Sequence, residues 1–225
     1  MFENLIRRVL TSLILLSILL VCLFLNKYSW LLLVIIASII CFFEFNNLSK
    51  KIWKGKKKSI YLSNTISFAY LLFLIFSSHE LYISGTIPEI VFVLLVCIFS
   101  DIGGYFIGKL VGGKKLIKIS PNKTISGSIG SFMFSLVPII LFLIIYDYTK
   151  DTSFKPQVSF STIILLTLFL SFICQVGDLI ISYYKRKAKV KDTGSILPGH
   201  GGLLDRIDGI IFAIPSFMIV SKIFF

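Results

Sequence analysis

Apolar residues in this chain come in long, almost uninterrupted runs, not in the short alternating pattern of a half-buried strand. Seven runs of about 20 residues, the length of a membrane-spanning helix, cover 9–26, 30–48, 60–78, 87–107, 129–146, 160–182 and 207–225. Such a helix crosses the ~30 Å hydrocarbon core of a bilayer. The pattern therefore predicts an all-α integral membrane protein, a polytopic bundle of about seven transmembrane helices.

The run at 30–48 is the least regular of the seven. Its apolar part ends at residue 43, and Glu44, Asn46 and Asn47 follow. Polar groups at that depth are costly unless they face protein or water. If this run spans the membrane, we expect its polar end to face protein or water.

Composition supports a membrane protein. Hydrophobic residues make up 56% of the 225 positions, and the mean hydropathy is +0.92, which exceeds what one soluble core of this size would bury. The cysteines show no metal-ligand spacing and are interpreted as small apolar residues of the spans; they are Cys22, Cys41, Cys97 and Cys174.

The net charge of +12 would suggest a nucleic-acid partner in a soluble protein. Here the basic residues are distributed unevenly between alternate loops, nineteen on one side of the predicted bundle and four on the other. The positive-inside rule then places the N-terminus and the three basic loops in the cytoplasm. We expect the basic loops to contact anionic membrane lipid, and we expect no nucleic-acid partner.

Chemistry is concentrated in the C-terminal part of the chain. We treat residues 1–225 as one membrane domain, in which 1–86 supply N-terminal spans and 87–225 form the catalytic region. The region carries most of the acids in or beside apolar runs, namely Glu89, Asp101, Asp178, Asp192, Asp205 and Asp208. The loops at 109–128 and 183–206 combine glycines with basic residues, which makes both candidate phosphate sites.

The stretch 182–208 is the most informative, because cations, glycines and acids are interleaved in it. Asp205 and Asp208 are three residues apart and share a face if a helix begins there. Salt bridges to Lys185 or Arg206 could account for one or two of the acids. The whole set is better explained by Mg²⁺ and polyphosphate, which carboxylates and lysines bind.

A set of residues at fixed spacing runs through this stretch, namely Ser182, Lys185, Arg186, Lys191, Asp192, Gly194, Leu197, Pro198, His200, Gly201, Gly202, Asp205, Arg206 and Asp208. In these residues the chain resembles the signature of the phosphatidate cytidylyltransferase (CDP-diacylglycerol synthase) family. Upstream the resemblance includes Asp101, Gly103, Gly104, Tyr105, Gly108, Gly112, Gly113, Ser120, Pro121, Lys123, Thr124 and Gly127. The chain departs from the family pattern at Asn122, usually lysine, and at Ser126, usually acidic.

The resemblance implies an activity and a setting. Its reaction joins the cytidylyl group of CTP to phosphatidic acid and gives CDP-diacylglycerol and pyrophosphate, for phospholipid biosynthesis. It also implies a helical membrane bundle, a homodimer, with a polar cavity open to the cytoplasm and to lipid. The expected location is the cell membrane, the inner membrane of a bacterium, with the active site facing the cytoplasm.

Site roles follow from the resemblance and from the chemistry of the reaction. Mg²⁺, alone or with a second cation, is expected on Asp178 and Asp205, at the ends of two spans where helices can fix them. Further catalytic residues are expected to be Lys191, Asp192, His200, Arg206 and Asp208. Substrate-binding residues are expected to be Asp101, Ser120, Lys123, Thr124, Ser182, Lys185, Arg186, Gly201 and Gly202.

Two other functions remain open at this point. A CTP-dependent lipid kinase acting on an isoprenoid alcohol resembles the family, but would need a base to activate the hydroxyl. An ion-coupled transporter would explain intramembrane acids, yet it gives no reason to gather glycines, lysines and aspartates in one loop.

Overall fold

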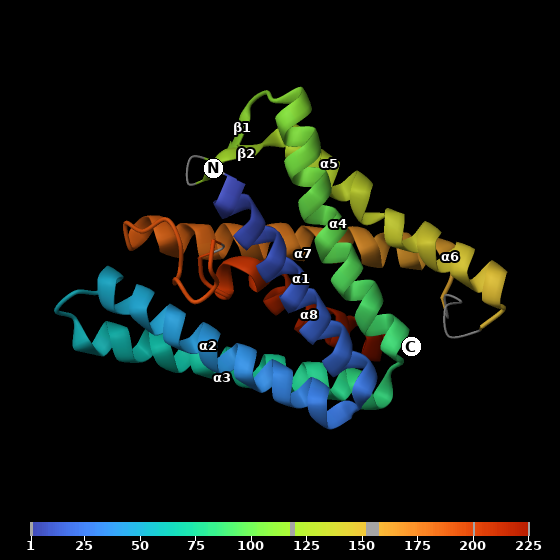
Figure 1. The fold of residues 1–225 in the computed structure, drawn as a ribbon, viewed down its shortest axis with the longest axis horizontal. Helices are drawn as coiled ribbons and strands as arrows, with labels where there is room; N and C mark the ends of the chain where they lie inside the picture. Colours follow the sequence, from blue (N-terminus) through green and yellow to red (C-terminus); the bar gives the residue numbers. More distant parts are fainter. Residues whose placement is uncertain (1, 118–119, 152–157, 200, 225) are drawn as a thin grey trace. The chain divides into compact units, whose positions relative to one another are not determined.

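The computed structural model describes residues 2–117, 120–151, 158–199 and 201–224 (Figure 1). In this part of the chain, helices account for almost all of the regular structure, which confirms the helical class. The helices are α1 (Phe2–Leu25), α2 (Lys27–Ile52), α3 (Lys57–Ser84), α4 (Ile87–Val111), α5 (Ile125–Ser135), α6 (Val137–Thr149), α7 (Phe160–Lys187) and α8 (Leu204–Phe224). Two strands, β1 (Lys115–Ile117) and β2 (Ser120–Thr124), pair antiparallel.

Five helical segments of the described chain are long and apolar enough to cross a membrane. They are α2, α3, α4, the α5–α6 segment Ile125–Thr149, and α7, and a shorter apolar helix covers Val9–Leu25. Large apolar side chains are exposed along these helices, for example Val21 at 61%, Ile66 at 62% and Leu165 at 68%. Such surfaces suit lipid, because a soluble monomer seldom exposes this much contiguous apolar area.

The chain forms two compact units. The first consists of Met1–Ile83 and Ile181–Asp208, and the second of Ser84–Ile180 and Gly209–Phe225. Helices α7 and α8 each begin in one unit and end in the other.

In the first unit, α2 and α3 lie side by side (Figure 1), and polar side chains join them. The Nε1 of Trp30 donates to the Oγ of Ser78 at 2.9 Å, and Asn64 donates to Asn46 at 2.8 Å. Hydrogen bonds of this kind satisfy polar groups that lipid cannot. The irregular run at 30–48 therefore continues as helix to Ile52, with its polar end partnered by protein.

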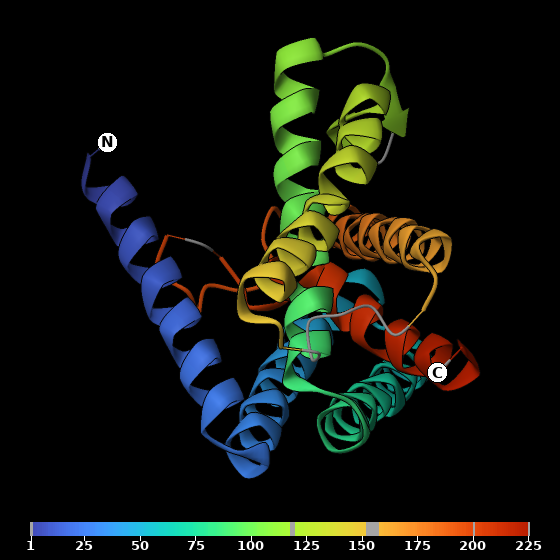
Figure 2. The same cartoon turned by 90° about the vertical axis from the view of Figure 1, so that its right-hand side faces the viewer.

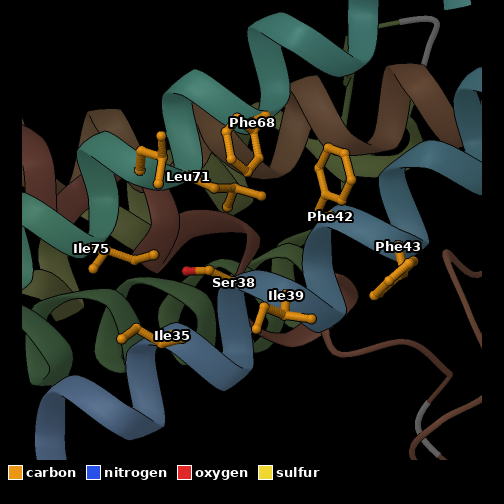
Figure 3. A pocket seen from close by; sticks show the side chains of 9 residues that line it. Ile35, Ser38, Ile39, Phe42, Phe43, Phe68, Leu71 and Ile75 are labelled. Atoms are coloured by element: carbon orange, nitrogen blue, oxygen red, sulfur yellow. The ribbon is translucent and has the colours of Figure 1, made fainter. Parts of the chain in front are cut away.

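An apolar groove of about 320 Å³ lies between α2 and α3 (Figure 3). It is lined by Ile35, Ser38, Ile39, Phe42 and Phe43 of α2 and by Phe68, Leu71, Leu72 and Ile75 of α3. No charged residue lines it, so this groove does not suit phosphate.

In the second unit, glycines allow α4 and α5 to pack backbone against backbone (Figure 2). A Cβ placed on Gly130 would lie 2.6 Å from the carbonyl oxygen of Gly103, and one on Gly127 would lie 2.8 Å from that of Gly104. Small residues at such crossings are typical of membrane helices. Several glycines that carry the family resemblance thus pack helices together.

The second unit also has two features that hydrophobicity did not predict. The first is the β1–β2 hairpin within the loop after α4. The second is a break in the run at 129–146, where α5 ends at Ser135 and α6 begins at Val137 with Pro138 in its first turn. Proline favours a helix start because it has no N–H to donate and fixes φ.

Candidate functional site

Charged side chains gather in the second unit at the β1–β2 hairpin. The Nζ of Lys123 on β2 lies 2.5 Å from Oδ2 of Asp178 on α7, and the two side chains are 25% and 31% exposed. Asp101 on α4 interacts electrostatically with both, being repelled by Asp178 and attracted by Lys123. We call Asp101, Lys123 and Asp178 the hairpin cluster.

The position of Lys123 is fixed by the junction between the hairpin and α5. Thr124 caps α5, since its Oγ1 accepts a hydrogen bond from the backbone N–H of Gly127 at 3.0 Å. The Oγ of Ser126 donates to the carbonyl of Gly112. Ser120 is buried at the start of β2. These contacts tie both ends of the hairpin to neighbouring backbone.

A second set of charges lies in the first unit, around the loop 188–203, which we call the signature loop. The Nζ of Lys185, near the end of α7, donates to Oδ1 of Asp205 at 2.7 Å. The two side chains are 17% and 6% exposed. Ion pairs this shielded from water are screened far less than surface pairs.

The other carboxylate oxygen of Asp205 is also occupied. Its Oδ2 accepts hydrogen bonds from the backbone N–H and Oγ1 of Thr193, at 2.8 and 3.0 Å, and from the N–H of Gly202 at 3.1 Å. Burial alone would raise the pKa of Asp205, but hydrogen bonds from Lys185, Thr193 and Gly202 outweigh it. The pKa of Asp205 therefore lies below its usual value, and the carboxylate is ionised at neutral pH.

Backbone conformation shapes the signature loop. Helix α7 ends at Lys187, and Lys189 just beyond it adopts φ +56°. The N–H of Val190 donates to the carbonyl of Lys185 at 3.0 Å, as in a Schellman motif. Gly199 and Gly201 have φ of +76° and +84°, a region that favours glycine. The N–H of Leu197 donates to the carbonyl of Gly201 at 3.0 Å, which closes the loop.

Sequence analysis did not predict a site role for Glu44 and Thr193. Glu44 on α2 is 3% exposed and accepts hydrogen bonds from Thr193 at 2.8 Å and from the N–H groups of Leu203 and Leu204, each at 2.9 Å. The signal for Glu44 was its place at the end of an apolar run. Nothing in the sequence marked Thr193.

The structure brings together some of the predicted site residues and leaves others apart. Asp178 belongs to the second unit and Asp205 to the first, and each pairs with a lysine of its own unit. The other predicted residues of the signature region differ in exposure. Arg186, Lys191, Asp192 and Arg206 are exposed, Ser182 and Gly201 are half-buried, and Gly202 and Asp208 are buried. His200 lies outside the described residues.

Carboxylate oxygens are the donors that Mg²⁺ prefers, so the chemistry of Asp178 and Asp205 fits that ion. Each carboxylate is now neutralised by a lysine, and a cation at Oδ1 of Asp205 would compete with Lys185. Among the described residues, no three His, Cys, Asp or Glu side chains come together as a preformed metal cluster.

Comparison with known proteins gives one family match. A model described as the cytidylyltransferase family matches residues 54–224, a range that includes the hairpin cluster and the signature loop but not Glu44.

Curated relatives carry the name phosphatidate cytidylyltransferase. The protein from Bacillus subtilis (strain 168) is 40% identical over 136 residues, which are 60% of this chain and 48% of that protein. The protein from Staphylococcus haemolyticus (strain JCSC1435) is 41% identical over 133 residues, which are 59% and 48% of the two chains. This chain thus spans about half the length of the curated relatives it matches.

Proposed function

Because this chain belongs to the cytidylyltransferase family, we propose that it transfers the cytidylyl group of CTP to phosphatidic acid. The products are CDP-diacylglycerol and pyrophosphate. The observation that carries the proposal is the shielded Lys185–Asp205 pair beside the glycine-containing signature loop, in a chain similar to proteins named for this activity.

The reaction needs no protein nucleophile. A phosphate oxygen of phosphatidic acid attacks the α-phosphorus of CTP, a new P–O bond forms, and the bond to the β-phosphate breaks. Pyrophosphate leaves with the electron pair. The attacking group is already an anion, so the chemistry asks the protein mainly for positioning and for relief of repulsion between phosphates.

Lysine side chains of the two units suit that task. Lys123 and Lys185 each carry a charge that an aspartate holds in place. Incoming phosphates would exchange with or share these partners, because ammonium groups bind phosphate oxygens strongly. In the first unit, the exposed Arg186 and Lys191 would add contacts to an anion that Lys185 binds.

We propose further that Mg²⁺, alone or with a second cation, binds through Asp178 and Asp205, where it would neutralise charge on the polyphosphate. Asp178→Asn and Asp205→Asn should each lower turnover, because each removes a carboxylate charge that a hard cation requires. Chelation should abolish turnover, and added Mg²⁺ should restore it. Full turnover in chelator would contradict the metal.

The proposed setting is the cell membrane of a bacterium, with seven spans, a cytoplasmic N-terminus and the active site facing the cytoplasm. Five helical segments of suitable length and a shorter apolar helix support a multi-pass membrane protein, and the one-sided distribution of lysine and arginine supports the proposed orientation. A homodimer is also proposed, and the mass of the detergent-solubilised protein by light scattering tests it.

Release of pyrophosphate by the purified chain tests the proposed function. It should require both CTP and phosphatidic acid, and an isoprenoid alcohol should not replace the lipid. Pyrophosphate release without phosphatidic acid, or none with both substrates, would contradict the proposal.

A further inference from the structure

Glu44 is a buried carboxylate that lies before residue 54, where the family match begins. It sits in α2 with 3% of its surface exposed. Among the described residues it forms no ion pair, and its hydrogen-bond partners are the Thr193 hydroxyl and the backbone N–H groups of Leu203 and Leu204. All three partners belong to the signature loop or to the start of α8.

These partners explain how an unpaired charge is tolerated there. An isolated carboxylate in an apolar helix is costly. The first N–H groups of a helix have no partner within the helix and carry the positive end of its dipole. Glu44 accepts from Leu204 in the first turn of α8 and from Leu203 just before it, so α2 supplies the cap of a helix that lies far along the chain.

The same carboxylate is linked to Asp205 through one hydroxyl. The Oγ1 of Thr193 lies 2.8 Å from Oε2 of Glu44 and 3.0 Å from Oδ2 of Asp205. A hydroxyl has one proton, so it donates to one of these acids at a time while contacting both. Thr193 therefore couples the placement of the two carboxylates.

Glycines of the signature loop are needed to let Glu44 approach. A Cβ on Gly194 would lie 2.6 Å from Oε1 of Glu44. A Cβ on Gly202 would collide with Oε2 of Glu44 and with the Thr193 hydroxyl. Neither glycine has a positive φ, so the absence of a side chain, and not conformational freedom, is what this position requires.

We propose that Glu44 is a positioning residue for the proposed reaction. It fixes the signature loop and the start of α8, and through Thr193 it holds Oδ2 of Asp205 so that Oδ1 faces Lys185 at 2.7 Å. Glu44 contacts no substrate in this role. The inference rests on the proposed function for its effect on turnover, but the effect on the loop can be measured without turnover.

The decisive variant is Glu44→Gln in the full chain, purified in detergent. Three donors converge on the two oxygens of Glu44, so an amide NH₂ in place of one oxygen would face a donor and lose its hydrogen bond. Turnover (kcat) should fall at least about 10-fold, while the KM for CTP changes little because the cations that hold phosphate remain. Glu80→Gln, in α3 of the same unit, is the matched control and should keep wild-type turnover.

Thr193 provides a second route if Glu44→Gln does not fold. Thr193→Val removes the hydroxyl and should lower kcat in the same direction, whereas Thr193→Ser keeps the hydroxyl and should restore it. In a folded Glu44→Gln/Thr193→Val protein, the two losses should be non-additive. A wild-type kcat in both Glu44→Gln and Thr193→Val, or equal losses in Glu80→Gln, would overturn the positioning role.

Hydrogen exchange separates this inference from the proposed function. In Glu44→Gln, backbone amides of residues 193–206 should exchange faster than in the wild type. Amides where α2 contacts α3 should exchange at the wild-type rate. The expected difference in exchange does not depend on turnover of CTP. A wild-type chain without turnover would therefore count against the proposed function and not against the role of Glu44. Unchanged exchange in 193–206 would overturn the role of Glu44.

Discussion

At the scale of single residues, Asp205 is a firmly held charge of the signature region. Four donors hold its two oxygens, from Lys185, Thr193 and Gly202. A hydrogen-bonded, shielded pair of this kind is sensitive to loss of one partner, because the other charge is left buried and unpaired.

Replacing this charge should abolish most of the proposed turnover. We expect Asp205→Asn to lower kcat/KM at least about 100-fold, or ~2.7 kcal/mol of transition-state stabilisation, because the amide leaves Lys185 without its counter-ion. Initial rates of pyrophosphate release measure the effect. The control is Asp147→Asn, which removes an exposed pair with Lys150 at 2.5 Å. This variant should keep the wild-type kcat/KM. A loss of kcat/KM below about 5-fold in Asp205→Asn would show that Asp205 is not part of the active site.

The lowered pKa of Asp205 predicts how stability depends on pH. A carboxyl whose folded pKa is depressed contributes stability above its unfolded pKa of about 3.9, and the contribution is lost as pH falls through the folded pKa. The difference in thermal midpoint between wild type and Asp205→Asn should therefore be constant from about pH 5 to 8 and shrink below about pH 4. A difference that shrinks between pH 7 and 5 would contradict the lowered pKa.

At the scale of elements, the contact between α4 and α5 depends on glycine. A Cβ on Gly130 would lie 2.5 Å from Cβ of Ile107 and 2.6 Å from the carbonyl oxygen of Gly103. The obstacle is backbone and a β-branched side chain, which yield less readily than the end of a flexible side chain.

Gly130→Ala should therefore destabilise the second unit. Overpacking of this kind costs about 1–3 kcal/mol, which should lower the thermal midpoint in detergent by several degrees. Met133→Ala, on an exposed position of the same helix, is the control and should change the midpoint little. Equal midpoints for Gly130→Ala and wild type would show that the helices separate without cost.

Sequence patterns predicted the helices well and the site less completely. Among the described residues, the apolar runs lie almost wholly in helices, although the run at 129–146 is broken between α5 and α6, because a run of about 20 apolar residues is a long signal. The β1–β2 hairpin was not predicted, since its strands hold only three and five residues. The contact of Glu44 with Thr193 joins residues 149 positions apart, and no local spacing encodes such a pair.

At the scale of the whole molecule, the distribution of charge predicts topology. Nineteen of the basic residues lie on the side predicted to be cytoplasmic, and CTP is a cytoplasmic substrate that is too polar to cross a bilayer unaided. The signature loop must therefore face the cytoplasm if the proposed function is right.

Single cysteines test this topology in intact cells. In a background without the four native cysteines, Ser153→Cys should react with an impermeant thiol reagent, because the loop after α6 is predicted to be outside. Ser195→Cys, in the signature loop, should react only after the cells are lysed. Labelling of Ser195→Cys in intact cells would reverse the proposed orientation.

The central claim is cytidylyl transfer, and the fate of the α-phosphate of CTP tests it most directly. Purified chain should be given phosphatidic acid and CTP labelled at either the α or the γ position. With the α label, radioactivity should appear in CDP-diacylglycerol in equal amount to the pyrophosphate released, and with the γ label all of it should appear in pyrophosphate. Transfer of the γ label to lipid, or no transfer of the α label, would contradict the account.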